Sequence, residues 1–116
     1  MSTIPHPDYS RRLDAQVAET LGWSDINFYS SGERLSAVVG RSPSGWRLSV
    51  PNYSTSDSTA VRALEAVGCD YEVEKNNGSY RVTIHAPGKF VGEGRSLALA
   101  ICLALKAAQP SPQPAQ

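Results

Sequence analysis

The polar residues best suited to chemistry lie on two predicted strands in the second half of the chain. Acidic, basic and histidine side chains alternate there with apolar ones, and the polar set is Glu72, Glu74, Arg81, Thr83 and His85. Alternate residues of a strand share a face, so these side chains would line one side of a hairpin. They could act as acid and base or bind a ligand. The pattern favours the simpler interpretation, a solvated face with cross-strand ion pairs.

A glycine-rich turn before the last predicted helix is the second candidate site. Its sequence is Gly92-Glu93-Gly94-Arg95-Ser96. Free amides at a helix start, together with an arginine, favour a phosphate or a carboxylate. The turn lacks the longer glycine-rich run, ending in Lys-Ser or Lys-Thr, of a phosphate-binding P-loop. Because Glu93 would also repel an anion, an ordinary turn and helix cap is the favoured interpretation.

The sequence offers no metal-binding or catalytic motif. His6 and His85 are the only histidines, and their spacing does not resemble a metal site. No combination of serine, histidine and acid suggests nucleophilic catalysis. Cys69 and Cys102 lack CxxC spacing and are predicted to be buried, reduced thiols. We therefore predict no catalytic residues, no metal and no cofactor, in a protein that is not an enzyme.

Periodicity and turn residues predict the elements that position these groups. Helices are predicted at about residues 11–21, 54–67 and 96–108. Strands are predicted at residues 35–39, 46–50, 69–75, 80–85 and 89–93. Hairpin turns are predicted at residues 41–45 and, with the strongest signal, at Asn76-Asn77-Gly78-Ser79. Residues 24–33 are predicted to be a loop.

The predicted organisation is one domain with two flanking segments. Residues 10–108 form the domain, residues 1–9 a flexible N-terminal arm, and residues 109–116 a disordered Pro/Gln-rich tail. The predicted fold class is α+β, an antiparallel sheet of about four to five strands packed with three helices. The polar face of the central hairpin indicates helices on one side of the sheet.

The last predicted helix is apolar nearly all round. Leu97, Ile101 and Leu105 form one stripe, whereas Leu99 and Leu103 lie well round the helix from it. Such a helix is buried on more than one side, by other elements of the chain or by another subunit. The first interpretation is favoured. The second makes Leu99 and Leu103 candidate interface residues of a homo-oligomer.

Composition argues against several classes of protein. The 116 residues are 41% apolar and 19% charged, and the formal net charge is zero. A neutral chain lacks the broad basic surface that nucleic acid or an anionic membrane attracts. No apolar run approaches the ~18 residues of a membrane span, and the N-terminus lacks an apolar targeting region. We therefore expect no membrane or nucleic-acid partner and a cytoplasmic location.

Several short motifs together resemble the phage ABA sandwich domain family, small proteins of tailed phages and prophages. They are Gly22-Trp23, Pro51-Asn52-Tyr53-Ser54-Thr55, Tyr71-Glu72-Val73, Gly94 and Ala98-Leu99-Ala100-Ile101-Cys102. The resemblance covers about residues 11–108 and implies, as an alternative fold, helices on both sides of the sheet in a layered α/β/α arrangement. The chain departs from the family at Ser56, where an acid is usual, and at Val61, where an aromatic is common.

The resemblance implies a non-enzymatic phage or prophage accessory protein that acts by binding in the cytoplasm of the bacterial host. Its finer implication is counter-defence, either by sequestering a nucleotide-type host signal or by blocking a host protein. Homo-oligomers with ligand pockets near subunit boundaries would follow. The candidate ligand-binding residues are Arg81, His85, Lys89, Gly94, Arg95 and Ser96. The alternatives are a small enzyme that uses the polar strand face, and a nucleic-acid-binding or virion structural protein.

Overall fold

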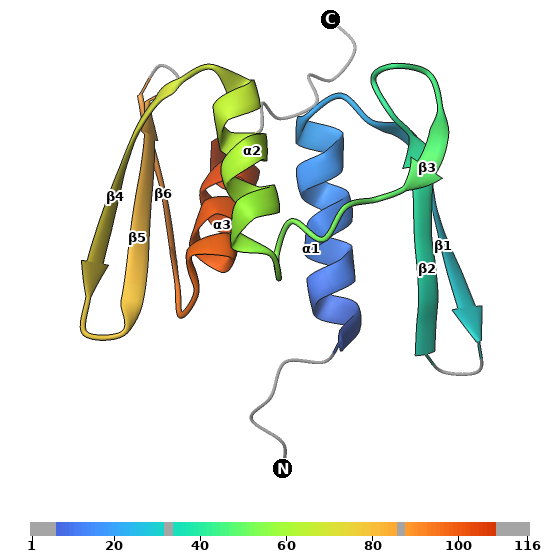
Figure 1. The fold of residues 1–116 in the computed structure, drawn as a ribbon, viewed down its shortest axis with the longest axis horizontal. Coiled ribbons are helices and arrows are strands. Elements are labelled where there is room, and N and C mark those ends of the chain that lie inside the picture. Colours follow the sequence, from blue (N-terminus) through green and yellow to red (C-terminus); the bar gives the residue numbers. More distant parts are fainter. Residues whose placement is uncertain (1–6, 32–33, 86–87, 109–116) are drawn as a thin grey trace, which may run out of the picture.

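Three helices lie between two three-stranded sheets in the computed structural model, which describes residues 7–31, 34–85 and 88–108 (Figure 1). The helices are α1 (Pro7–Thr20), α2 (Asp57–Val67) and α3 (Leu97–Ala108). The strands are β1 (Ser24–Ser31), β2 (Arg34–Arg41), β3 (Arg47–Ser49), β4 (Asp70–Asn76), β5 (Ser79–His85) and β6 (Lys89–Gly94). The sheet orders are β1-β2-β3 and β4-β5-β6, and all neighbours are antiparallel.

This architecture confirms the α+β class but corrects the predicted arrangement. The described residues contain six strands rather than four to five, and they form two sheets rather than one. The helices fill the middle layer, so the alternative α/β/α order is wrong as well (Figure 1). Hairpin signals identify strands that are neighbours in sequence. They do not show that α2, which follows β3, carries the chain across to a second sheet.

The central helix is α3. It packs against β5 and β6 on one side and against α1 and α2 on the other. Its buried residues are Ala98, Ala100, Ile101, Cys102, Ala104 and Leu105. A helix that is apolar nearly all round needs cover on more than one side, and other elements of the same chain supply that cover here.

Gly92 allows β6 to lie directly on the backbone of α3. A Cβ atom at this position would collide with backbone atoms of Ala100 and Ala104, and would lie 2.9 Å from the carbonyl carbon of Leu103. A glycine inside a strand often marks such a close approach between two backbones. The alanines on the facing side of α3 extend the close contact, because they add little bulk of their own.

The first half of the chain differs from its prediction at two elements. α1 begins at Pro7 rather than Arg11, so residues 7–9 belong to its first turn rather than to a flexible arm; proline suits the first helical position because its missing N–H is not needed there. β1 occupies most of the predicted loop at residues 24–33. The pairing of β1 with β2 shifts register between Ser24 and Asn27 and again between Tyr29 and Ser30. These shifts interrupt the alternation of side chains by which a strand is recognised in a sequence. Residues 1–6 and the predicted tail lie outside the described residues.

The predicted hairpins are confirmed. β2 pairs with β3 through Val39 and Ser49, and β4 pairs with β5 through Glu74 and Arg81. The turn between β4 and β5 has positive φ at Asn77 (49°) and Gly78 (79°). Two positive φ angles define the type I′ turn, which the Asn-Gly dipeptide favours.

A buried ionic network ties α1 to the segment that leads into α2. Asp14 is fully buried, and its carboxylate lies 2.7 Å from Nη1 of Arg11. The other oxygen of Asp14 accepts a hydrogen bond from the Ser54 amide at 2.7 Å. Arg11 also donates through Nη2 to the Val50 carbonyl at 2.8 Å. A buried charge is tolerated when it is paired and hydrogen-bonded in this way, and the network fixes residues 50–54 on α1.

Candidate functional site

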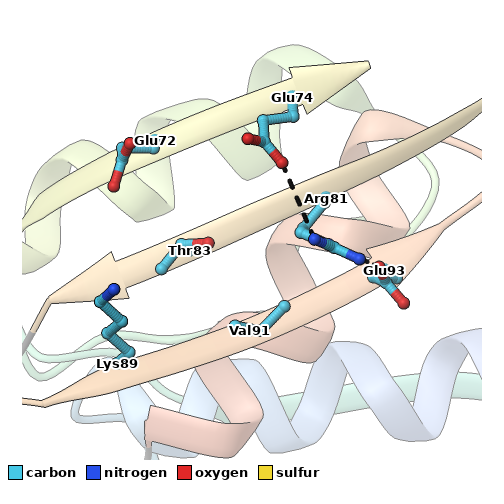
Figure 2. Close-up of a pocket in the computed structure, with 7 residues that line it drawn as sticks. All are labelled: Glu72, Glu74, Arg81, Thr83, Lys89, Val91 and Glu93. Carbon is cyan, nitrogen blue, oxygen red and sulfur yellow. Dashed lines mark hydrogen bonds and ion pairs between the residues drawn. The ribbon is translucent and has the colours of Figure 1, made fainter. Parts of the chain in front are cut away.

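The polar residues predicted from the sequence do share one face of the β4-β5-β6 sheet. Val82 and Ile84 of β5 are fully buried against the helices, so Arg81, Thr83 and His85 point to the opposite, outer face. That face forms a shallow hollow of about 430 Å³, here called the polar hollow. Figure 2 shows its lining: Glu72, Glu74, Arg81, Thr83, Lys89, Val91 and Glu93.

Ion pairs between neighbouring strands occupy most of the charges of the polar hollow. Arg81 Nε donates to Glu93 Oε2 at 2.6 Å, and its Nη1 lies 4.0 Å from Glu74 (Figure 2). At the edge of the hollow, His85 Nε2 lies 2.9 Å from Glu72. The hydrogen bond to Glu93 raises the pKa of Arg81 above its usual value. The cross-strand pairs that alternation predicted are therefore present, and the arginine is already engaged.

The charge of the polar hollow does not suit an anionic ligand. Three glutamates face Arg81 and Lys89, so acidic groups outnumber basic ones. All three carboxylates are more than half exposed, where water screens their interactions. The hollow is better suited to a positively charged group.

The backbone amides at the start of α3, where an anion site was predicted, already donate hydrogen bonds to side chains of this chain. The Ser96 hydroxyl accepts a hydrogen bond from the Leu99 amide at 3.1 Å. The Asp57 carboxylate, from the start of α2, accepts one from the Ala98 amide at 2.9 Å. The helix start therefore has a negatively charged partner within the chain, the arrangement that the helix dipole favours.

The structure does not bring the six predicted ligand-binding residues into one site. Arg81, His85 and Lys89 belong to the outer face, whereas a Cβ at Gly94 would lie 2.8 Å from Leu99, on the inner face. Arg95 is exposed and has no ion pair or hydrogen bond within the described part of the chain. Leu99 and Leu103, the predicted interface residues, are partly buried against the core.

A second hollow of about 460 Å³ lies between α2, the segment that leads into it, and the turns that follow α1 and β2. We call it the aromatic cleft. It is lined by Leu21, Trp23, Pro43, Pro51, Tyr53, Thr59, Arg62, Ala63 and Ala66. The sequence did not predict it, because its walls come from segments far apart in the chain. The motifs Gly22-Trp23 and Pro51-Asn52-Tyr53 supply three of these residues, but as sequence they indicated only turns and caps.

The aromatic cleft combines flat apolar walls with one free cation. Tyr53 is 6% exposed. This burial raises the pKa of its phenol, and a hydrogen bond with Trp23 lowers it by a smaller amount. Arg62 is exposed, and within the described residues it has no ion pair or hydrogen bond. Flat rings stack on aromatic side chains, and a free guanidinium pairs with phosphate or carboxylate. Because Tyr53 is buried, Trp23 is the aromatic ring of the cleft that is partly exposed, and it lies in the same hollow as the unpaired guanidinium.

The metal-binding and nucleophilic side chains of the described residues were the remaining candidates for a site. Among the described residues, no group of histidine, cysteine and acidic side chains could hold a metal ion. Burial raises the pKa of the Cys102 thiol to about 12, so it stays protonated and is a poor nucleophile near neutral pH. No helix within the described ranges is long and apolar enough to cross a membrane.

Comparison with solved structures links this fold to a phage protein. A phage protein from Bacillus cereus ATCC 14579, whose crystal structure was solved at 2.0 Å, is similar with a TM-score of 0.64 and 20% sequence identity. The match covers 93% of this chain and 96% of that one. No protein-family model and no curated protein matches the sequence. The similarity shows a shared fold, while membership of the phage ABA sandwich domain family stays a prediction.

Proposed function

We propose that this chain is a non-enzymatic phage or prophage protein that binds a nucleotide-type ligand in the aromatic cleft. The observation that carries the proposal is the free guanidinium of Arg62 beside the apolar walls formed by Trp23 and Tyr53. A base would stack on the partly exposed ring of Trp23, and a phosphate would pair with Arg62. The polar hollow is a weaker candidate, because its glutamates outnumber its bases.

The biological role that fits this proposal is counter-defence in the cytoplasm of the bacterial host. A small protein that binds a nucleotide-type signal without converting it would lower the free concentration of that signal. The similarity to a phage protein supports the setting. Blocking of a host protein is the alternative role.

Isothermal titration calorimetry on the full chain tests the proposal. Cyclic dinucleotides and ADP-ribose are the probes, with adenosine and inorganic phosphate as controls that each offer half of the recognised chemistry. We expect measurable binding of a phosphorylated nucleotide and much weaker binding of either control, since the cleft uses both the ring and the anion. No heat and no thermal shift with any of these nucleotides would overturn the proposal.

Native mass spectrometry of the purified chain tests the predicted homo-oligomer at the same time. The expected result is a mass that corresponds to several subunits, with any bound nucleotide visible as an added mass. A monomeric mass would contradict the predicted interface at Leu99 and Leu103. It would not affect the proposed nucleotide site, because the aromatic cleft lies within one subunit.

A further inference from the structure

β4 presents a free edge in the described structure. β4 lies at the end of its sheet and, within the described strands, hydrogen-bonds only to β5. All seven of its residues are exposed. An edge of this length presents unpaired amides and carbonyls on which another strand can add.

The inner face of β4 also carries uncovered apolar side chains. Tyr71 and Val73 pair with Ile84 and Val82, which are fully buried. The helix layer reaches β5 and β6 through α3, but it leaves Tyr71 38% and Val73 45% exposed. An added strand with apolar side chains on this face would cover both residues, which is worth roughly 25 cal/mol for each Å² of apolar surface removed from water.

The charges on the outer face of β4 determine which charge an added partner strand should carry. Glu72 and Glu74 alternate with the two apolar residues, and their side chains are 69% and 68% exposed. Opposite charges on directly paired residues stabilise an antiparallel pair, and like charges destabilise it. A strand with Lys or Arg on its outer face therefore fits this edge.

A second copy of this chain does not fit the same edge. In a two-fold antiparallel pair of β4 strands that keeps the inner faces on one side, the central registers place Glu72 opposite Glu72, Glu72 opposite Glu74, or Glu74 opposite Glu74 of the other copy. Each of these registers pairs like charges. The edge thus disfavours self-pairing and leaves a basic partner as the occupant.

We propose that β4 is a docking edge for an extended segment of a partner protein in which apolar residues alternate with Lys or Arg. The apolar residues would cover Tyr71 and Val73, and the basic residues would lie beside Glu72 and Glu74. This surface shares no residue with the aromatic cleft, so this proposal does not rest on the proposed nucleotide site.

Two capped peptides of the length of β4 test this edge, one alternating valine with lysine and the other valine with glutamate. Binding is followed by calorimetry and by NMR shifts of backbone amides in the full chain. The wild type is expected to prefer the lysine peptide by at least about tenfold, with the largest shifts in β4. The double variant Glu72→Lys/Glu74→Lys should reverse this preference, and because both residues are exposed it should keep its fold.

Equal binding of both peptides by the wild type, an unchanged preference in the double variant, shifts confined to β1, β3 or β6, or no binding of either peptide would each overturn the proposal. Self-association of the wild type that the double variant abolishes would also overturn it, because β4 would then pair with a second copy.

Discussion

The polar hollow and the aromatic cleft have nearly the same volume, about 430 and 460 Å³, but opposite chemistry. The polar hollow lies on the open face of a single sheet, and its charges are paired with one another across neighbouring strands. The aromatic cleft lies at the junction of three parts of the chain, and Arg62, its only charge, is unpaired in the described structure. The two hollows therefore differ in whether their charges are already paired within the chain.

The two regions also differ in what holds them together. Residues 50–54, which form one wall of the aromatic cleft, are fixed by the buried carboxylate of Asp14. The polar hollow depends on exposed pairs such as that between Arg81 and Glu93. Buried pairs are costly to break, whereas exposed pairs contribute little. Mutations that remove one partner from each pair should therefore have very different effects.

The largest expected effect is on the cleft side. Asp14→Ala would leave Arg11 without its partner and the Ser54 amide without its acceptor. Loss of one partner of a fully buried ion pair typically costs about 3–5 kcal/mol, and the partial exposure of Arg11 (24%) favours the lower end of that range. Urea denaturation should show a decrease of this order in the free energy of unfolding. Glu93→Ala is the matched change in the polar hollow. If Asp14→Ala lowered the free energy of unfolding no more than Glu93→Ala does, the buried pair would be no more important to stability than the exposed one.

The same region should make the protein sensitive to alkali. Burial raises the pKa of the Cys102 thiol from 9.0 to about 12, and burial also raises the pKa of the Tyr53 phenol. Because folding favours the protonated forms, their stabilising contribution is complete below about pH 9 and is lost as pH rises towards 12. The melting temperature should therefore fall across this interval.

Cys102→Ala is the control for alkaline sensitivity. It removes the titrating thiol, so the slope of melting temperature against pH should decrease whatever the change does to stability at neutral pH. A slope identical to that of the wild type would show that other groups cause the alkaline loss.

The smallest expected effect is that of Arg81→Ala. Although this residue contacts Glu93 and Glu74, all three side chains are more than half exposed, and water screens their pairing. The melting temperature should be almost unchanged, and its dependence on salt should weaken. A destabilisation comparable to that of Asp14→Ala would show that the polar hollow is a structural centre of the fold.

The sequence predicts those elements whose hydrophobic pattern or turn residues lie within one helix, strand or hairpin. The Asn77-Gly78 turn, the strands on either side of it and the apolar α3 helix all follow from residues within one element or one hairpin. β1 was missed because its register shifts interrupt the alternation of side chains.

Contacts between distant segments could not be predicted in the same way. Asp14 and Ser54 are forty residues apart, and Trp23, Tyr53 and Arg62 reach the aromatic cleft from different elements. The arrangement of two sheets around the helices likewise depends on packing that hairpin signals do not contain. For these reasons the polar face was found from the sequence, whereas the aromatic cleft was not.

The most direct test of the account compares Arg62→Glu with Arg81→Glu in calorimetric titrations with the nucleotide that the wild type binds best. Both residues are exposed arginines, so each variant reverses one surface charge by the same amount. If the aromatic cleft is the binding site, Arg62→Glu should weaken binding by at least about tenfold, the loss expected for one charge-assisted hydrogen bond, while Arg81→Glu leaves the affinity within about twofold. Loss of binding in Arg81→Glu with unchanged binding in Arg62→Glu would place the ligand in the polar hollow and contradict the account.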